Sequence, residues 1–261
     1  MLNILGMGVY LPKNEITNDF LNKEVGLERG SDWVDSRLGI HTRYSVLSKD
    51  YIRTTKNKNP AEAIAHARAL GDTPVTMAVK AAKQDLEKAG VNASQIGRVI
   101  VNNDTPYETI PNTAMLVAKA LGVGDGPHCD INSACSSFAL HMKLLNDTRE
   151  DALPEFTLCV QSSSYTTRTD YSPASIDGYI FGDGAAASVV SAKHEGTLTV
   201  EPMIFETDPT GAEEIIVETT GHFRQNGAVV REFSIRKTCE MFEAIAAQKE
   251  LYAEHAYTVA H

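Results

Sequence analysis

The sequence predicts an α/β protein, because short β-branched stretches alternate with longer helical stretches along its 261 residues. Residues 97–102 have the β-branched character of a buried strand. Residues 74–89 read as a helix that proline opens and Gly90 ends. This alternation is typical of covered sheets, so we expect mostly parallel strands. The chain is 43% hydrophobic and 22% charged, which is enough apolar material for a sizeable core.

The individual elements follow from periodicity and from their start and stop signals. We predict strands at 2–5, 97–102, 157–162, 185–191, 197–204, 214–218 and 256–260. We predict helices at 16–25, 31–38, 61–70, 74–89, 133–145 and 233–250. Thr17 or Asn18 is the expected cap of the first helix, and a glycine-opened turn is expected within 6–12. The polar segment 49–60 is predicted to be a solvated loop, with a docking patch for an acidic partner as the alternative.

Charge and cysteine content exclude several classes of protein. The 24 basic and 34 acidic side chains give a net charge of −10, which disfavours nucleic-acid binding and a polybasic membrane anchor. The sequence has no run of about 18 apolar residues and no signal-like amino terminus, so we expect a cytoplasmic protein. The 4 cysteines are too few for a disulfide scaffold and lack the spacing of a zinc site, so no metal is expected.

A dinucleotide site is not expected either. Gly6 and Gly8 follow a predicted strand, but Leu11 stands where the third glycine of the fingerprint belongs, and Pro12 follows it. The sequence contains no Walker A loop, G-x-S-x-G elbow or H-E-x-x-H motif.

Cys135 is the candidate nucleophile. A strand at 129–131 leads into small residues, and the cysteine then stands at the predicted start of a helix. Unpaired backbone N–H groups and the helix dipole at such a position lower a thiol pKa, and the same groups can hold an oxyanion. On this local pattern alone, a buried structural cysteine is an equally good interpretation.

The order of five segments decides between these interpretations, because together they resemble the β-ketoacyl-acyl carrier protein synthase III family of thiolase-fold condensing enzymes. The matching segments are 6–12, 32–40, 129–141, 181–187 and His261. The resemblance implies a thiolase-like layered αβαβα fold with two similar halves. We therefore expect an N-terminal half with the nucleophile at 1–192, and the start of an incomplete C-terminal half at 193–261.

The resemblance also implies roles for particular residues. Cys135 corresponds to the nucleophile that accepts an acyl group from a thioester. His261 corresponds to the first residue of the family's His-Gln-Ala-Asn segment, which assists decarboxylation of a malonyl thioester. The decarboxylated carbon then attacks the acyl-cysteine in a Claisen condensation.

Four further positions are expected to bind substrate. Trp33 and Arg37 match residues that contact the adenine part of coenzyme A, and Arg168 matches a third; their ordinary alternatives are core packing for the indole and surface ion pairs for the arginines. Ile110 matches the tip of a loop that enters the acyl pocket of a partner subunit, at a position where a larger aromatic residue is common.

This chain departs from the family pattern in three places, one of which is a longer segment at 45–70 that suggests a specialised paralogue. It stops at His261, without the later segments of the family, so condensation by this chain is expected to be impaired. Ala228 and Glu232 stand where asparagine and lysine are frequent, which leaves acyl-coenzyme A and acyl-carrier protein both open as donors. The expected partners are these thioesters and a second copy in a homodimer, with no permanently bound cofactor. Acyl transfer to oxygen or nitrogen, and an inactive synthase-like subunit, are the alternative functions.

Overall fold

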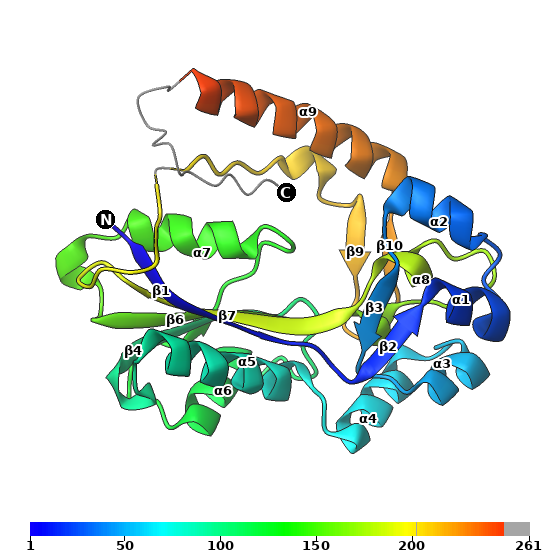
Figure 1. Cartoon of the computed structure of the whole chain (residues 1–261), viewed down its shortest axis with the longest axis horizontal. Helices are drawn as coiled ribbons and strands as arrows, with labels where there is room; N and C mark the ends of the chain where they lie inside the picture. The colour runs from blue at the N-terminus through cyan, green and yellow to red at the C-terminus, as the bar shows by residue number, and fades with distance from the viewer. Residues whose placement is uncertain (202, 248–261) are drawn as a thin grey trace.

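A six-stranded sheet forms the centre of the protein in a computed structural model that describes residues 1–201 and 203–247. Its strands are β1 (Asn3–Tyr10), β4 (Ile96–Asn102), β5 (Cys129–Asp130), β6 (Phe156–Ser164), β7 (Asp183–Ser191) and β8 (Leu198–Thr199). They lie in the order β5-β4-β6-β7-β1-β8. Figure 1 labels the four longer strands of this sheet, β4, β6, β7 and β1. The α/β class is therefore as predicted.

The sheet is mixed rather than mostly parallel, so that expectation was wrong. Strand β4 runs parallel to β5 and to β6, whereas β6–β7, β7–β1 and β1–β8 are antiparallel. The segment between β6 and β7 holds only the short helices η4 (Tyr165–Arg168) and α8 (Asp177–Ile180). Without a long crossover helix, the chain returns beside β6 in the opposite direction.

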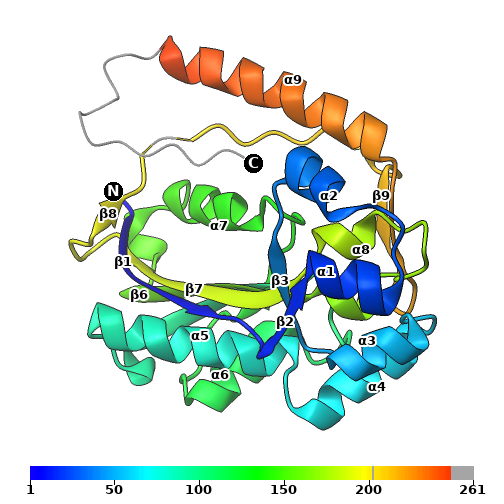
Figure 2. The same cartoon turned by 45° about the vertical axis from the view of Figure 1, so that its right-hand side comes forward.

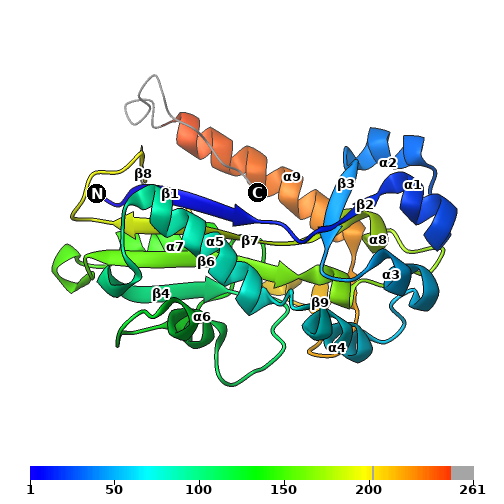
Figure 3. The same ribbon diagram turned by 60° about the horizontal axis from the view of Figure 1, so that its bottom comes forward.

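Helices α5 (Pro74–Ala89) and α6 (Thr113–Leu121) cover one face of the sheet, and α7 (Ser137–Asn146) covers the other (Figures 1 and 3). Helix α5 matches its prediction, since Thr73 forms a capping box with Thr76 and Gly90 ends the helix at φ 66°. Helix α6 was not predicted. Its small buried residues, such as Ala114 and Ala118, carry a weak signal in the sequence.

Two glycines let α5 lie directly on β1. A Cβ atom at Gly8 would stand 2.0 Å from the carbonyl oxygen of Ala81, and one at Gly6 would stand 2.7 Å from Oδ1 of Asp85. Both glycines lie inside β1 rather than in a turn, so the predicted glycine-opened turn was wrong. They serve the close approach of helix and strand.

The remaining elements of the first half form a layer at one end of the sheet. They are β2 (Asn14–Thr17), α1 (Asn18–Phe20), η1 (Leu21–Val25), α2 (Ser31–Leu38), β3 (Thr42–Ser45), α3 (Lys49–Thr55) and α4 (Pro60–Leu70). Thr17 caps α1 as predicted. The predicted loop at 49–60 was wrong, because Ser48 Oγ caps α3 through the N–H of Tyr51 (3.2 Å) and Ile52 is fully buried.

The chain after β7 leaves the sheet after one short strand. Strand β8 is shorter than the predicted strand at 197–204, and a hairpin of β9 (Ile215–Val217) and β10 (Phe223–Gln225) follows. Helix α9 (Gly227–Ala246) then runs above α7 and α2 (Figure 2). Short turns at η2 (Ala93–Gln95), η3 (Glu150–Ala152) and η5 (Pro209–Gly211) complete the list. None of the helices in the described part combines the length and apolar character that a bilayer crossing requires.

The predictions for the carboxyl-terminal end of the chain and for its division into halves are not tested by the described residues. The predicted strand at 256–260 and His261 fall outside the described residues, as does the end of the helix predicted at 233–250. The division into halves at 192 stays a prediction.

Asp85 carries an ionisable group into the packing between α5 and the sheet. The residue is fully buried, and neither carboxyl oxygen has a hydrogen-bond partner of normal geometry among the described residues. Burial raises the pKa of Asp85 to about 6, and the nearby Val189 backbone and Lys88 charge offset only part of this effect.

We expect Asp85 to make stability depend on pH. The folded protein keeps this proton between pH 4 and 6 while the unfolded chain releases it, so the free energy of unfolding falls as pH rises through this window. The loss at neutral pH is about 3 kcal/mol. Asp85→Asn should remove this loss, so its urea midpoint at pH 7.5 should exceed that of the unmodified protein. The exposed Asp125→Asn is the control. If the urea midpoint varied with pH in the same way for all three proteins, the expectation would be contradicted.

Candidate active site

Cys135 lies in the turn that links β5 to α7, at the carboxyl end of the strand. The residue is exposed, so the alternative of a cysteine buried in apolar packing does not hold for this side chain. Ala134, directly before it, has a left-handed backbone with φ 46°. A non-glycine residue in this region is strained and persists only where its surroundings hold it.

Ser137 supplies that restraint. Its buried Oγ accepts a hydrogen bond from the N–H of Ser133 (2.6 Å) and donates one to the carbonyl oxygen of Ala134 (2.7 Å). Helix α7 begins at Ser137, four residues later than predicted, because this side chain binds the preceding backbone and closes a separate turn.

The pKa of the Cys135 thiol is raised, so the expected lowering was wrong. Desolvation by the surrounding turn raises this pKa most, and the negative charge of Asp104 raises it further, against a smaller opposing effect of the cysteine's own N–H. The sulfur stands two residues before the helix begins. The N–H groups of Ser136 and Ser137 bind the carbonyl oxygens of Ser133 and Ala134 and are therefore not free for an anion.

The other cysteines are less suitable nucleophiles. Cys159 is fully buried, and burial raises its thiol pKa far above the ordinary value. Cys129 is half-buried in β5, and desolvation likewise raises its pKa. Cys239 is exposed on α9 and is not part of the lining of the pocket described below.

His141 is a buried residue for which the sequence suggested no role. Its Nε2 donates a hydrogen bond to the carbonyl oxygen of Ile131 (2.8 Å), and its Nδ1 accepts one from the Gln161 amide (3.0 Å). Desolvation lowers the pKa of His141, so the ring is neutral in this arrangement. The histidine thereby ties α7 to the strand ends.

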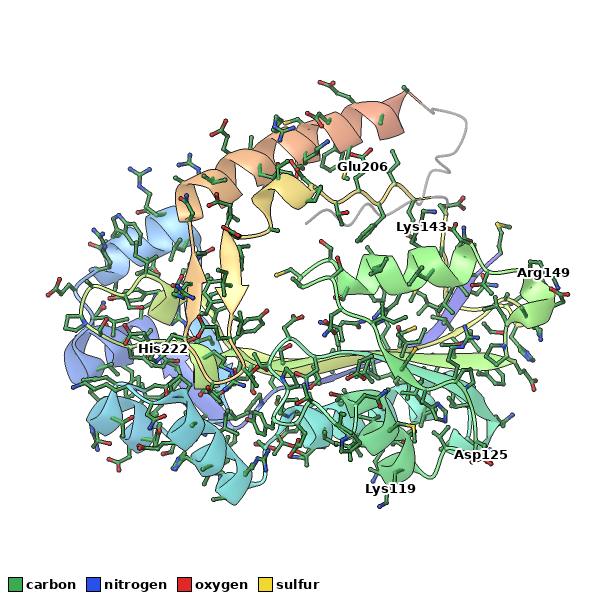
Figure 4. The ribbon with its side chains drawn as sticks, turned by 180° about the vertical axis from the view of Figure 1, so that it is seen from behind. Lys119, Asp125, Lys143, Arg149, Glu206 and His222 are labelled. Atoms are coloured by element: carbon green, nitrogen blue, oxygen red, sulfur yellow. The ribbon has the colours of Figure 1, made fainter. Side chains whose placement is uncertain are left out.

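A pocket of about 360 Å³ opens beside the cysteine turn. Its walls come from the loops after β4 and β5, from η4, and from the β9–β10 hairpin; the lining includes Asp104, Asn132, Ala134, Tyr165, Arg168 and Glu218. The hairpin is held by Phe223, whose ring centroid lies 4.4 Å from that of Phe181. His222, labelled in Figure 4, adds a hydrogen bond from its Nε2 to the carbonyl oxygen of Asn57 (2.6 Å).

Of the four predicted substrate-binding residues, only Arg168 lines the pocket. Arg168 lies in the pocket wall and is almost fully buried; its Nη2 donates to the carbonyl oxygen of Pro106 (3.3 Å), and burial lowers its pKa. The surface-pair alternative for Arg168 is therefore wrong. Trp33 and Arg37 lie on α2, outside the pocket lining, where Trp33 packs half-buried beneath Arg29 and Arg37 is exposed. Ile110 is 89% exposed.

Asp183 explains the glycine-rich segment at 181–187. Its buried carboxylate accepts hydrogen bonds from the N–H of Val46 (2.7 Å), from the N–H of Thr166 (2.8 Å) and from the Thr166 hydroxyl. Burial nevertheless raises the pKa of Asp183 to about 7. The contact fixes η4, the segment that carries Tyr165 and Arg168 into the pocket.

The described residues contain no group of three or more His, Cys, Asp or Glu side chains placed to hold a metal ion.

Comparisons with known proteins identify relatives over most of the chain. Residues 129–209 match the model of the 3-oxoacyl-[acyl-carrier-protein] synthase III family. A β-ketoacyl-[acyl-carrier-protein] synthase III of Hyphomonas neptunium is 28% identical over 95% of this chain and 72% of that protein. The corresponding protein of Anaplasma marginale is 32% identical over 73% of this chain, which spans about half (51%) of that relative.

Solved structures agree in fold. The 3-oxoacyl-[acyl-carrier-protein] synthase III of Aquifex aeolicus superposes with a TM-score of 0.74 at 25% identity, over 91% of this chain and 68% of the other. The priming β-ketosynthase of the R1128 polyketide pathway gives a TM-score of 0.73 at 22% identity, over 91% and 67%. The layered thiolase-like architecture expected from the sequence is therefore present.

We expect Ser137→Ala to destabilise the cysteine turn. The substitution leaves the N–H of Ser133 without its acceptor and removes one of the two hydrogen bonds to the carbonyl oxygen of Ala134, which costs about 1 kcal/mol. Urea unfolding measures the loss. Ser136→Ala, which removes a hydroxyl that makes no capping bond, is the matched control and should change stability much less. Equal losses of stability in the two variants would argue against a stabilising role of the Ser137 hydroxyl.

Proposed function

Because the chain belongs to the β-ketoacyl-acyl carrier protein synthase III family, we propose that it acts as a condensing enzyme that carries an acyl group on Cys135. The observation that supports this most directly is the position of Cys135. It is an exposed thiol on a constrained turn, beside a pocket at the carboxyl ends of parallel strands. Ligands of open α/β sheets bind at this edge. The comparisons favour neither acyl transfer to oxygen or nitrogen nor an inactive subunit.

In the first half-reaction, an acyl thioester occupies the pocket and Cys135 Sγ attacks its carbonyl carbon. The carbon–sulfur bond to the donor breaks, so that the acyl group is now joined to Cys135 and the donor leaves as a free thiol. Donor and product are both thioesters, and the step needs no oxidant or reductant.

In the second half-reaction, a malonyl thioester loses carbon dioxide, and the resulting enolate attacks the acyl-cysteine carbonyl. A new carbon–carbon bond forms and the cysteine sulfur leaves as a thiolate. His261, which lies outside the described residues, is the proposed hydrogen-bond donor to the enolate oxygen.

The donor is a thioester of coenzyme A or of an acyl carrier protein. Arg37 is exposed on α2, where it can reach an anionic donor, and Arg168 stiffens the pocket wall from its buried position. Ala228 and Glu232 are both exposed on α9, outside the pocket lining, so neither selects one donor over the other within the pocket.

We expect incubation with an acyl thioester to add one acyl mass to the intact protein, at Cys135. Mass spectrometry of proteolytic fragments locates the adduct, with acyl-coenzyme A and acyl-carrier protein tested in parallel. Cys135→Ala should abolish the adduct, whereas Cys239→Ser, which removes the other exposed thiol, should leave it unchanged. Failure of both donors to label Cys135 would reject the proposed function.

Ile110 is proposed to enter the acyl pocket of a second copy in a homodimer. An isoleucine that is 89% exposed in a single chain is suited to burial in such an interface. Ile110→Phe should narrow the pocket and shift acyl preference toward shorter chains, whereas Ile110→Ala should shift it toward longer or branched chains. Competition between short and long acyl thioesters measures the ratio. The same ratio in all three proteins would contradict this role.

A further inference from the structure

Polar side chains make up most of the wall of the pocket beside Cys135. Amide, carboxylate, phenol and guanidinium groups all take part, and they include those of Asn103, Asp104, Asn132, Tyr165, Arg168 and Glu218. Placing a polar group against a hydrocarbon chain without a partner costs free energy. The wall therefore suits an unsubstituted acyl chain only if each of its polar groups is satisfied within the protein.

The two amides of the wall are satisfied in this way. The Asn132 amide accepts a hydrogen bond from the N–H of Asn103 (3.0 Å) and donates one to the carbonyl oxygen of the same residue (3.4 Å). The Asn103 amide donates to Oγ1 of Thr113 (3.1 Å) and accepts from the N–H of Thr105 (3.1 Å). These bonds join the loops that follow β4 and β5, and they engage both ends of each amide.

The carboxyl group of Asp104 is satisfied at one oxygen only. Its Oδ2 accepts hydrogen bonds from the Tyr165 hydroxyl (3.1 Å) and from the Asn102 amide (3.4 Å), whereas its Oδ1 accepts none from the described residues. This oxygen is not closed off from solvent. The unpartnered Nε and Nη1 of Arg168 are closed off, so they lie inside the wall rather than at its surface. Oδ1 of Asp104 is therefore the acceptor that this part of the wall presents to a ligand.

The surroundings of Asp104 hold that oxygen in place. The ring of Tyr165 stacks on Phe181 with 4.9 Å between the ring centroids, and Phe223 meets it edge-on at 6.0 Å. The backbone N–H of Asp104 donates to Oγ of Ser163 (3.3 Å). Because both the backbone and the bonded oxygen are fixed, a ligand that binds Oδ1 loses little free energy in ordering this side chain.

The sheet brings this acceptor into the pocket that serves the cysteine. Asp104 follows β4 and Cys135 follows β5, and these two strands are parallel neighbours, with Val101 opposite Asp130. Asp104 and Ala134, the residue before the cysteine, line the same pocket. An acyl group whose carbonyl carbon lies at the Cys135 sulfur therefore shares this pocket with the free oxygen.

The charges of the wall favour a neutral donor on the ligand. Arg168 is almost fully buried, and its only hydrogen bond among the described residues goes to the carbonyl oxygen of Pro106. This uncompensated positive charge disfavours a cationic ligand group in the same pocket. A hydroxyl is a neutral donor, and its hydrogen bond to a carboxylate is short and charge-assisted.

We infer that the pocket selects hydroxyacyl thioesters, because the hydroxyl of the acyl group donates a hydrogen bond to Oδ1 of Asp104. The inference rests on the proposed function and names its substrate class. An acyl group without a hydroxyl displaces water from this oxygen and gives it no donor in return, so the wall disfavours unsubstituted chains.

Competition between butyryl and hydroxybutyryl thioesters of the same donor tests this selection, since the competing substrates differ by one hydroxyl. The 2-hydroxy and 3-hydroxy compounds are each supplied as separate enantiomers, and mass spectrometry measures the ratio of the two adducts on Cys135. The unmodified protein should favour at least one hydroxybutyryl thioester by about 10-fold or more, as expected for a hydrogen bond to a charged group. Asp104→Ala should bring that ratio close to one. Glu218→Gln, which removes the other carboxylate of the lining, is the matched control and should leave the ratio unchanged.

A butyryl thioester that labels Cys135 as fast as every hydroxybutyryl thioester overturns the inference, and so does a preference that Asp104→Ala retains. Asp104→Asn keeps an acceptor for the Tyr165 hydroxyl and serves as a second variant if the alanine protein does not fold. It should also reduce the preference, and an unchanged ratio in this variant counts against the inference. If the unmodified protein is labelled by none of the thioesters, the proposed function is what fails.

Discussion

The hydrogen bonds of the Ser137 hydroxyl are the contact on which the rest of the site depends. They close the turn after β5 over a left-handed Ala134 and so set where the sulfur of Cys135 stands. Strand β5 has only two residues, so the sheet alone gives little control over the chain that follows it. Position is supplied locally by the serine and, across the strand ends, by His141 bound to the carbonyl oxygen of Ile131.

The pocket wall formed by η4 depends on the buried carboxylate of Asp183. Asp183 gathers Val46 and Thr166 around itself, and thereby brings η4 with Tyr165 and Arg168 against the loops of the parallel strands. The rings of Tyr165, Phe181 and Phe223 then fasten the hairpin to this wall. Because Asp183 and Asp85 both carry raised pKa values, the arrangement lowers stability toward alkaline pH.

The sequence predicted those features that local signals control. Helix α5 was recognisable from Thr73, Pro74 and Gly90, whose capping roles depend only on near neighbours. Strand direction was not predictable, because strands buried on both faces read as continuous apolar runs whether their neighbours are parallel or antiparallel. The start of α7 was predicted too early because the small residues before Ser137 are compatible with a helix. The Ser137 hydroxyl instead binds the backbone of Ser133 and Ala134 and closes a separate turn there. Cys135 was identified by the order of distant segments, whereas Asp104 was missed, since only strand pairing brings it near the thiol.

A raised thiol pKa limits the side reactions of an exposed cysteine. The thiolate, rather than the thiol, is the form that oxidants and alkylating agents attack. An exposed Cys135 that stays protonated at rest is therefore protected in spite of its accessibility.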